Sequence, residues 1–261
     1  MIAQIAPEIR QDIEARLAKI EASEGVRYLL AVESGSRAWG FPSPDSDYDV
    51  RFFYVRPRDW YLSLKPGRDV IERPIVDEID LNGWDIRKAL GLMLGSNVVV
   101  NEWLTSPIRY RPDDPAVTGI AALADAIFDP HGYARHYARL GSNAAERWLE
   151  CDDAVPVKRY FYALRPALAI RALRHNPDRR PSMNLQALLT ESAVPPPIAG
   201  MIEELVEAKR LTRELGNTRR FPELDALIRD ELGRAAELPE RKPAETALAA
   251  ANDIFLDLVR E

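Results

Sequence analysis

The run DYDVRFFYV, from Asp47 to Val55, constrains the fold more than any other part of this chain. Its centre is continuously apolar, which predicts a β-strand that is buried on both faces. Two acids, Asp47 and Asp49, stand at its start. Alternate residues of a strand share a face, so their Cα atoms are expected to lie roughly 6–7 Å apart on one side.

Two carboxylates that close are costly unless a cation lies between them. A hard divalent ion with oxygen ligands, such as Mg²⁺, meets that requirement. The competing interpretation is a solvated strand end, or an Asx turn that starts the strand. The Asp-x-Asp pattern alone favours this second interpretation, so the residues before the strand have to decide between them.

Gly35 and Ser36 come directly after VRYLLAVES, residues 26–34, which is predicted as an earlier strand. Glycine lets a ligand approach the main chain, and serine offers a hydroxyl and a backbone N–H, so the pair suits phosphate oxygens. An ordinary strand-to-loop turn is the alternative. The glycine spacing fits neither a P-loop nor the dinucleotide-binding fingerprint.

Hydrophobic periodicity predicts an α+β protein with a small mixed sheet followed by an all-helical domain. Before residue 113 we expect a helix at 9–22, the two strands already described, a hairpin of strands at 68–73 and 75–83, and a helix at 84–96. Strand signals nearly vanish beyond that point, where we expect helices at 121–128, 136–149, 157–175, 197–215, 224–237 and 244–259. We therefore predict domains at 1–112 and 113–261.

The charge is unevenly distributed, although the net charge is −6. A basic island between residues 156 and 181 contains Lys158, Arg159, Arg165, Arg171, Arg174, Arg179 and Arg180 against the single acid Asp178. It indicates either a local anionic ligand or a solvated helix face. On a helix Lys158, Tyr162 and Arg165 share one face, and Pro166 is expected to kink that helix or to begin a new one.

One cysteine, Cys151, excludes an internal disulfide and fits a reducing cytoplasm. The first residues lack the apolar centre of a signal peptide, and no apolar run is long enough to span a bilayer. We therefore expect a cytoplasmic protein with no membrane partner. The three histidines lack cysteine partners at zinc-like spacing and are assigned no metal.

The Gly-Ser pair followed by Asp-x-Asp resembles the nucleotidyltransferases of the DNA polymerase β superfamily. The fuller strings GSRAWG, from Gly35, and SDYDVR, from Ser46, are similar to one branch, the RlaP-like predicted nucleotidyltransferases associated with RNA repair. The strings IDLNGWDIRKAL, NEWLTSPIRY and KRYFYALRPALAIR also match that branch, so the resemblance covers both halves of the chain.

This resemblance implies a polymerase β-like domain and two-metal phosphoryl transfer. Asp47 and Asp49 match the catalytic metal ligands. The third carboxylate comes from Asp77, Glu78 or Asp80; we select Asp80, with Glu78 as the alternative because both would share a strand face.

Other predicted contacts follow from the same resemblance. Gly35, Ser36 and Arg37 are expected at the phosphates, and Lys158, Tyr162 and Arg165 at the triphosphate or the base, on a helical domain that closes the nucleotide site. Arg51 either steers the carboxylates, meets the substrate or forms a plain ion pair. Trp39, Trp84 and Asp85 are interpreted as structural, with Asp85 as a helix cap.

The predicted function is a nucleotidyltransferase that depends on Mg²⁺ or Mn²⁺. It would transfer a nucleoside monophosphate from an NTP, ATP among the candidates, to a hydroxyl and release pyrophosphate. The acceptor is left open among an RNA end, a protein and a small molecule. The alternative is a non-catalytic nucleotide-binding regulatory or antitoxin-like partner protein. The NTP preference and the oligomeric state stay open.

Overall fold

A computed structural model describes residues 5–65, 67–146, 155–211, 217–242 and 245–260. It confirms the α+β class: a four-stranded mixed sheet lies near the N-terminus, and the chain that follows is mostly helical. Cys151 and the predicted helix ends Leu149 and Leu215 lie outside the described residues.

The described chain forms two compact units. The first, the α/β unit, contains the described residues of 1–38, 47–127 and 243–261, and the second, the helical unit, those of 39–46 and 128–242. The domain boundary after residue 112 stays a prediction. In these units the chain segments alternate, so that the last helix belongs with the sheet and an early loop belongs with the helices.

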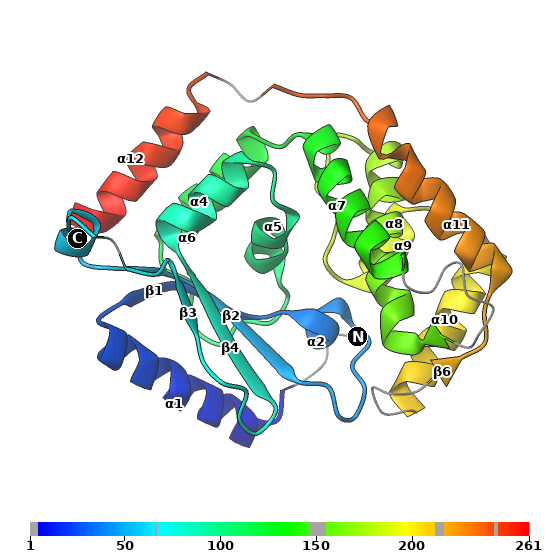
Figure 1. Ribbon diagram of the computed structural model, residues 1–261, viewed down its shortest axis with the longest axis horizontal. Coiled ribbons are helices and arrows are strands. Elements are labelled where there is room, and N and C mark those ends of the chain that lie inside the picture. Colours follow the sequence, from blue (N-terminus) through cyan, green and yellow to red (C-terminus); the bar gives the residue numbers. More distant parts are fainter. Residues whose placement is uncertain (1–4, 66, 147–154, 212–216, 243–244, 261) are drawn as a thin grey trace. The chain divides into compact units, whose positions relative to one another are not determined.

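The sheet of the α/β unit has the order β1-β2-β4-β3 (Figure 1). Its strands are β1 (Arg27–Glu33), β2 (Tyr48–Val55), β3 (Val70–Glu72) and β4 (Ile79–Asp85). β1 and β3 pair antiparallel with their neighbours, whereas β2 and β4 are parallel. This parallel pair brings the starts of two strands to the same edge.

One face of the sheet packs on α1 (Pro7–Glu24), through Ile13, Leu17 and Ile20. These residues recur at helical spacing, so they share one face of the predicted helix. The helix ends where Gly25 adopts the left-handed conformation, with φ 60°, and its amide donates to the Glu21 carbonyl. The helix predicted at 9–22 is therefore confirmed.

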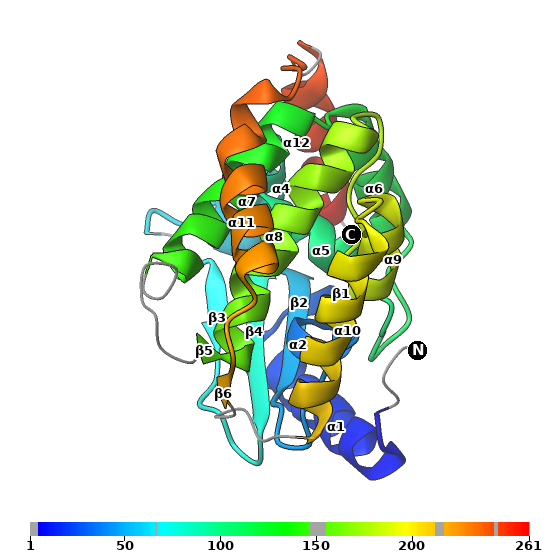
Figure 2. The ribbon, with the colours of Figure 1, turned by 90° about the vertical axis from the view of Figure 1, so that its right-hand side faces the viewer.

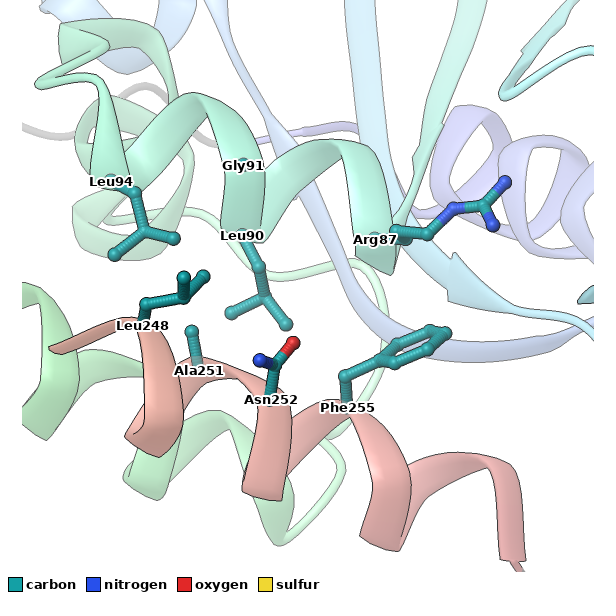
Figure 3. A pocket seen from close by; sticks show the side chains of 8 residues that line it. All are labelled: Arg87, Leu90, Gly91, Leu94, Leu248, Ala251, Asn252 and Phe255. Atoms are coloured by element: carbon teal, nitrogen blue, oxygen red, sulfur yellow. The ribbon is translucent and has the colours of Figure 1, made fainter. Parts of the chain in front are cut away.

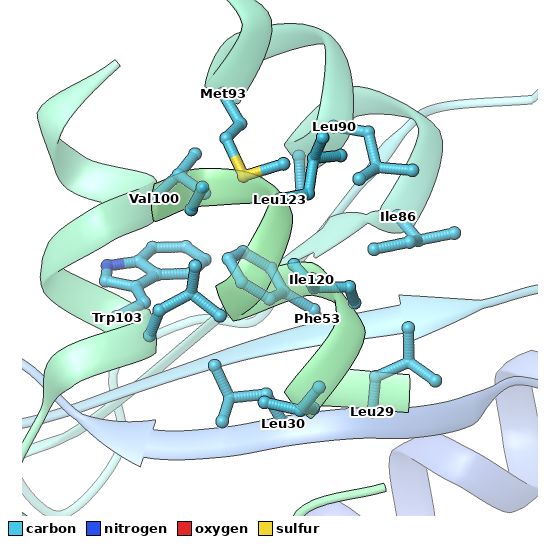
Figure 4. Packing of buried hydrophobic residues seen from close by; sticks show 14 of the residues in the cluster. Leu29, Leu30, Phe53, Ile86, Leu90, Met93, Val100, Trp103, Ile120 and Leu123 are labelled. Carbon is cyan, nitrogen blue, oxygen red and sulfur yellow. The ribbon is translucent and has the colours of Figure 1, made fainter. Parts of the chain in front are cut away.

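The opposite face packs on a second apolar cluster, drawn in part in Figure 4. The helices that contribute are α4 (Ile86–Leu94), α5 (Val98–Thr105), α6 (Ala116–Ala126) and α12 (Ala247–Arg260). Phe53 of β2 packs in this cluster and Phe52 in the other, and both are fully buried. The prediction that the strand is buried on both faces is confirmed.

The segments that flank β2 form single helical turns. α2 (Gly35–Trp39) lies before β2 and α3 (Arg58–Tyr61) lies after it. β3 and β4 form the predicted hairpin.

The helical unit is built around α8 (Val157–His175), against which α7 (Pro130–Ala145) and α11 (Pro222–Gly233) pack (Figure 2). The remaining elements are α9 (Leu185–Glu191), α10 (Pro196–Leu211), the 3₁₀ turn η1 (Arg234–Glu237) and two short paired strands, β5 (Val155–Pro156) and β6 (Asn217–Thr218). α9 and both short strands are absent from the sequence expectation. Pro166 neither ends α8 nor begins a new helix, because α8 continues through it to His175.

Part of the basic island stabilises the interior of this unit. Glu231 is fully buried, and its two carboxylate oxygens accept from Arg171 at 2.8 Å and Arg174 at 2.7 Å. A buried carboxylate requires such partners because its desolvation is otherwise strongly unfavourable. These two arginines are therefore structural rather than a solvated face. Among the described helices, none combines the length and hydropathy that a bilayer crossing needs.

Two helical glycines differ in the space around them, so alanine substitutions at the two positions should have opposite effects on stability. A Cβ on Gly141 of α7 would lie 2.5 Å from Leu232 Cδ2 and 3.1 Å from Pro166 Cβ, whereas a Cβ on the exposed Gly119 of α6 meets nothing within 4 Å. We expect Gly119→Ala to raise the free energy of unfolding by about 0.5–1 kcal/mol through helix propensity. Gly141→Ala should lower it by about 1 kcal/mol or more through overpacking. Urea unfolding of both variants checks this, and stabilisation by both substitutions would contradict it.

Candidate active site

Asp49 and Asp80 lie side by side across the parallel pair of strands. They are register partners of β2 and β4, so their side chains emerge on the same face. That face divides along the strands: Asp49 and Arg51, then Phe53, follow one another on β2, and the same change from polar to apolar occurs on β4. The candidate site therefore occupies the end of the sheet face where the apolar cluster stops.

Arg51 provides the positive charge between these two acids. Its Nη2 donates to Asp49 Oδ1 at 2.8 Å and to Asp80 Oδ2 at 2.7 Å. Because one nitrogen contacts both oxygens, the distance between Asp49 Oδ1 and Asp80 Oδ2 cannot exceed the sum of these two N–O distances. A guanidinium in this position offsets the repulsion of the two like charges. Of the three roles considered for Arg51, the structure shows the ion pair, which is made with both carboxylates.

The main chain also holds Arg51 in place. Its Nη1 donates to the carbonyl oxygens of Val50 at 3.1 Å and Asp80 at 3.0 Å. The guanidinium thus bonds to both strands, which leaves it little rotational freedom. One oxygen of each carboxylate is therefore oriented by a fixed partner.

The second oxygen of Asp49 faces the Gly-Ser turn. Gly35 opens α2 with φ 60°, and a Cβ built on it would lie 1.9 Å from Asp49 Oδ2. Only glycine fits there, because any side chain would collide with the carboxylate and strain the backbone. The amide of Ser34 also donates to the Asp49 carbonyl at 2.8 Å. The turn predicted to bind phosphate is thus in contact with one of the predicted acids.

Glu33 is a buried acid that the sequence analysis did not select. It is fully buried at the end of β1, where Oε1 accepts from the Asp49 amide at 3.1 Å and Oε2 accepts from the Tyr110 hydroxyl. Burial, with a smaller effect of the Asp49 charge, raises the pKa of Glu33 to about 8. The sequence signal that could have identified Glu33 is its position as an acid at the end of an apolar strand.

Asp47 lies just before β2 and is half-buried. Its carbonyl oxygen accepts from Arg37 Nε at 3.3 Å, and the Arg37 guanidinium lies 3.9 Å from the centre of the Tyr48 ring. Arg37 is therefore tied to the start of β2, next to the half-buried Ser36 at the start of α2.

The two competing third acids lie in the β3–β4 turn and not on the strand. Asp77 and Glu78 have positive φ angles, 54° and 61°, and both are exposed. The expectation that Glu78 shares a strand face with Asp80 is wrong, because the chain turns before β4 begins at Ile79. Asp77 instead pairs with Arg16 of α1 at 2.7 Å.

The predicted nucleotide contacts on α8 differ in exposure. Lys158 is half-buried and Tyr162 is exposed, whereas Arg165 is buried, donates to the Met183 carbonyl at 3.1 Å and lies 4.0 Å from the Trp39 ring centre. Arg165 is thus engaged in packing within the helical unit. Trp39 packs on Arg165 and Tyr162, as expected for an anchor.

Trp84 and Asp85 have the structural roles that the sequence indicated. Trp84 packs on Trp103, with ring centres 4.2 Å apart and ring planes tilted by 33°. Asp85 caps α4 by accepting from the Arg87 amide at 2.9 Å, and also accepts from the Tyr61 hydroxyl at 2.7 Å. Burial raises the pKa of Asp85. Neither residue belongs to the carboxylate site.

A pocket of about 240 Å³ lies between α4 and α12, and its lining is mostly apolar (Figure 3). It is lined by Arg87, Leu90, Gly91, Leu94, Leu248, Ala251, Asn252 and Phe255. None of the predicted site residues is among them, so we do not assign the pocket to the carboxylate site.

The carboxylates fit a divalent cation in part. Asp49 and Asp80 already share one cationic nitrogen and offer the oxygen ligands that Mg²⁺ or Mn²⁺ prefers. Within the described part of the chain, no group of three or more His, Cys, Asp or Glu side chains is arranged to hold a metal ion. Asp47, two residues before Asp49, therefore does not complete a three-acid group with the pair.

Two comparisons with known proteins show what this chain is similar to. Residues 9–257 match the RlaP family, described as the RNA repair pathway DNA polymerase beta family. The "Uncharacterized protein YcgL" of Bacillus subtilis (strain 168) is similar to this chain: 38% of 255 aligned residues are identical, and the alignment covers 97% of each protein. Both similarities extend across the carboxylate strands and the helical unit.

The contribution of Arg51 can be measured by a double-mutant cycle. Arg51→Met should lower the free energy of unfolding by about 1–3 kcal/mol at pH 7, because two adjacent carboxylates lose their shared cation. In an Asp80→Asn background the same substitution should cost less, since one of the two charges is gone. Urea unfolding in EDTA gives the coupling energy. Equal costs in both backgrounds would contradict the shared role.

Glu33 predicts a specific dependence of stability on pH. Its pKa is raised from 4.5 to about 8 in the folded protein. Between these values the folded state keeps a proton that the unfolded state releases, so this stabilisation is complete below 4.5 and is lost as the pH rises through 8. Relative to Glu33→Gln, the wild type should lose up to about 1.4 kcal/mol per pH unit in that window. Urea unfolding in EDTA at pH 5, 6, 7 and 8 measures the difference, and parallel curves would refute the prediction.

Proposed function

The chain belongs to the RlaP family of polymerase β-like proteins, and we propose from this premise that it transfers a nucleoside monophosphate from an NTP to a hydroxyl group and releases pyrophosphate. The observation that carries the proposal is the contact of Asp49 with both Gly35 and Arg51, beside Asp80. A turn suited to phosphate and a pair of oriented acids thereby occur at one place.

The reaction requires positioning and charge stabilisation rather than a nucleophile from the protein. The Gly35 main chain and the Ser36 hydroxyl and amide would contact phosphate oxygens of the NTP. Arg37, in the middle of the same short helix, would add a positive charge. The acceptor hydroxyl would approach on the side of the carboxylates.

Asp49 and Asp80, with Asp47 after a change of side-chain rotamer, would hold the divalent cations. Bound Mg²⁺ or Mn²⁺, as a pair of ions, would supply the charge that activates the acceptor hydroxyl and neutralises the triphosphate. Arg51 would keep one oxygen of Asp49 and one of Asp80 in a fixed direction. The other oxygens are then the ones available to the ions.

The helical unit would contribute to nucleotide binding. For the domain organisation, we propose a helical domain at 113–261 that closes the nucleotide site. Lys158 and Tyr162 are accessible for that purpose. The buried Arg165 would act indirectly, through the Trp39 ring that it contacts. The acceptor is proposed to be an RNA end, in keeping with the family description, with a protein or a small molecule as the other outcomes of an acceptor screen.

The alternative is a nucleotide-binding regulatory or antitoxin-like protein without turnover. One observation favours it: Arg51 engages both converged carboxylates, and no third acid joins them among the described residues. Tight NTP binding without pyrophosphate release on any acceptor would support this alternative.

The roles of the acids can be separated by isosteric substitutions. We expect Asp49→Asn and Asp80→Asn each to lower pyrophosphate release from labelled NTPs at least about 100-fold, the scale for losing one electrostatic contact to a transition state. Glu78→Gln is the matched control, because Glu78 lies in the exposed turn before β4. The assay is run with Mg²⁺ and with Mn²⁺. A loss in Glu78→Gln equal to that in Asp80→Asn would overturn the choice of Asp80.

A further inference from the structure

Residues 39–46 join the Gly-Ser turn to the acids, yet they pack with the helices. We call this stretch, from Trp39 to Ser46, the anchored segment. It belongs to the helical unit, whereas the residues on both sides of it, up to Ala38 and from Asp47, belong to the α/β unit. The shortest covalent connection between the two proposed motifs therefore passes through the helical unit.

Phe41 is the apolar anchor of the segment. It is 1% exposed and stacks on Phe161 of α8, with ring centres 4.1 Å apart and an angle of 16° between the ring planes. Trp39 packs beside it, 5.8 Å from the Phe41 ring. Buried aromatic pairs of this kind are stabilised by ring–ring contact in addition to the burial of their apolar area.

Gly40 is the residue of the segment that contacts the start of α9. Its carbonyl accepts from Gln186 Nε2 at 3.3 Å, and its φ is +92°. A Cβ there would lie 2.4 Å from Gln186 Oε1 and 2.7 Å from Asn184 Nδ2. Asn184 caps α9 and Gln186 lies in its first turn, so the start of that helix presses on the segment.

Ser43 is the polar anchor. Its hydroxyl lies 2.8 Å from the Ser46 hydroxyl and accepts from Lys209 Nζ of α10 at 3.3 Å. All three side chains are buried, and Lys209 is 3% exposed. Burying a lysine ammonium is strongly unfavourable unless it is well partnered, so Lys209 depends on polar partners such as Ser43.

Gly40, Phe41 and Ser43 lie within four consecutive positions of the chain. Their partners lie on three different helices, α9, α8 and α10. Each residue of a polypeptide has only two soft dihedral angles. Few freely rotating angles therefore separate the anchors from the motifs. Gly35 is four residues before Trp39, in a hydrogen-bonded turn, and Asp47 directly follows Ser46. A movement of α8, α9 or α10 relative to the sheet must therefore be taken up at the two motifs.

We propose that the anchored segment couples the helical unit to the carboxylate site, with Phe41, Gly40 and Lys209 as positioning residues that set the Gly-Ser turn and Asp47. Nucleotide contacts made by the helical unit would be transmitted to the acids through this segment. The inference rests on the proposed function for its catalytic consequence. Its structural part, the coupling of the anchors to both motifs, does not depend on turnover.

The test uses the full-length protein with Lys209→Met and Phe41→Leu, which loosen the polar and apolar anchors separately. Ile228→Val is the matched control, because Ile228 is fully buried in α11 and lies outside the segment. Lys209→Arg is the conservative variant. Circular dichroism melts confirm that each variant is folded at the temperature of the assay.

The first readout is amide hydrogen exchange at residues 36–38 and 47–49 without nucleotide. We expect Lys209→Met and Phe41→Leu to accelerate exchange about tenfold at both stretches, Lys209→Arg to do so much less, and Ile228→Val to leave them unchanged. Unchanged exchange at both stretches in Lys209→Met and Phe41→Leu would overturn the coupling. Equal acceleration in Ile228→Val would overturn it as well, because it would show general loosening.

The second readout is steady-state pyrophosphate release. The two loosening variants should lower kcat at least about tenfold with little change in KM, because the motifs are misplaced rather than removed. A normal kcat together with accelerated exchange would overturn the positioning role. If the wild type itself shows no turnover, the proposed function fails, while hydrogen exchange still decides whether the segment is coupled to the motifs.

Discussion

The pairing of β2 with β4 is the constraint on which the candidate site depends. A parallel pair places equivalent positions of two distant strands side by side, and here it brings Asp49 next to Asp80. Adjacent carboxylates repel each other, and Arg51 on the same strand face offsets that repulsion through one shared nitrogen. Its second nitrogen bonds to the main chain of both strands, so the charge and the strand pairing stabilise each other.

The same face of the sheet provides both the core and the site. At one end Phe53 and Trp84 pack against Trp103 of α5, and this apolar contact holds the strands on the helices that follow. At the other end the side chains are polar and the apolar cluster stops. Rigid support next to a polar edge is what a site needs in order to hold charges in fixed directions.

Charge in the helical unit is used differently. Glu231 takes up Arg171 and Arg174 inside the unit, and Arg165 lies against Trp39. A count of basic residues therefore overstates the positive surface available to a polyanion. The segment between the Gly-Ser turn and Asp47 takes its own supports from this unit, at Phe161, Gln186 and Lys209.

The sequence by itself determined the local elements of this protein. An apolar run predicts β2, helical periodicity predicts α1, and the Gly-Ser and Asp-x-Asp strings identify the family, because each signal lies within a few residues. Only the tertiary structure decided between Asp80 and Glu78 as the neighbour of Asp49, since strand register and the turn at Asp77 are not encoded in local pattern. It also revealed the burial of Glu33 and the anchoring of Phe41, because both depend on partners far away in the chain, Tyr110 and Phe161.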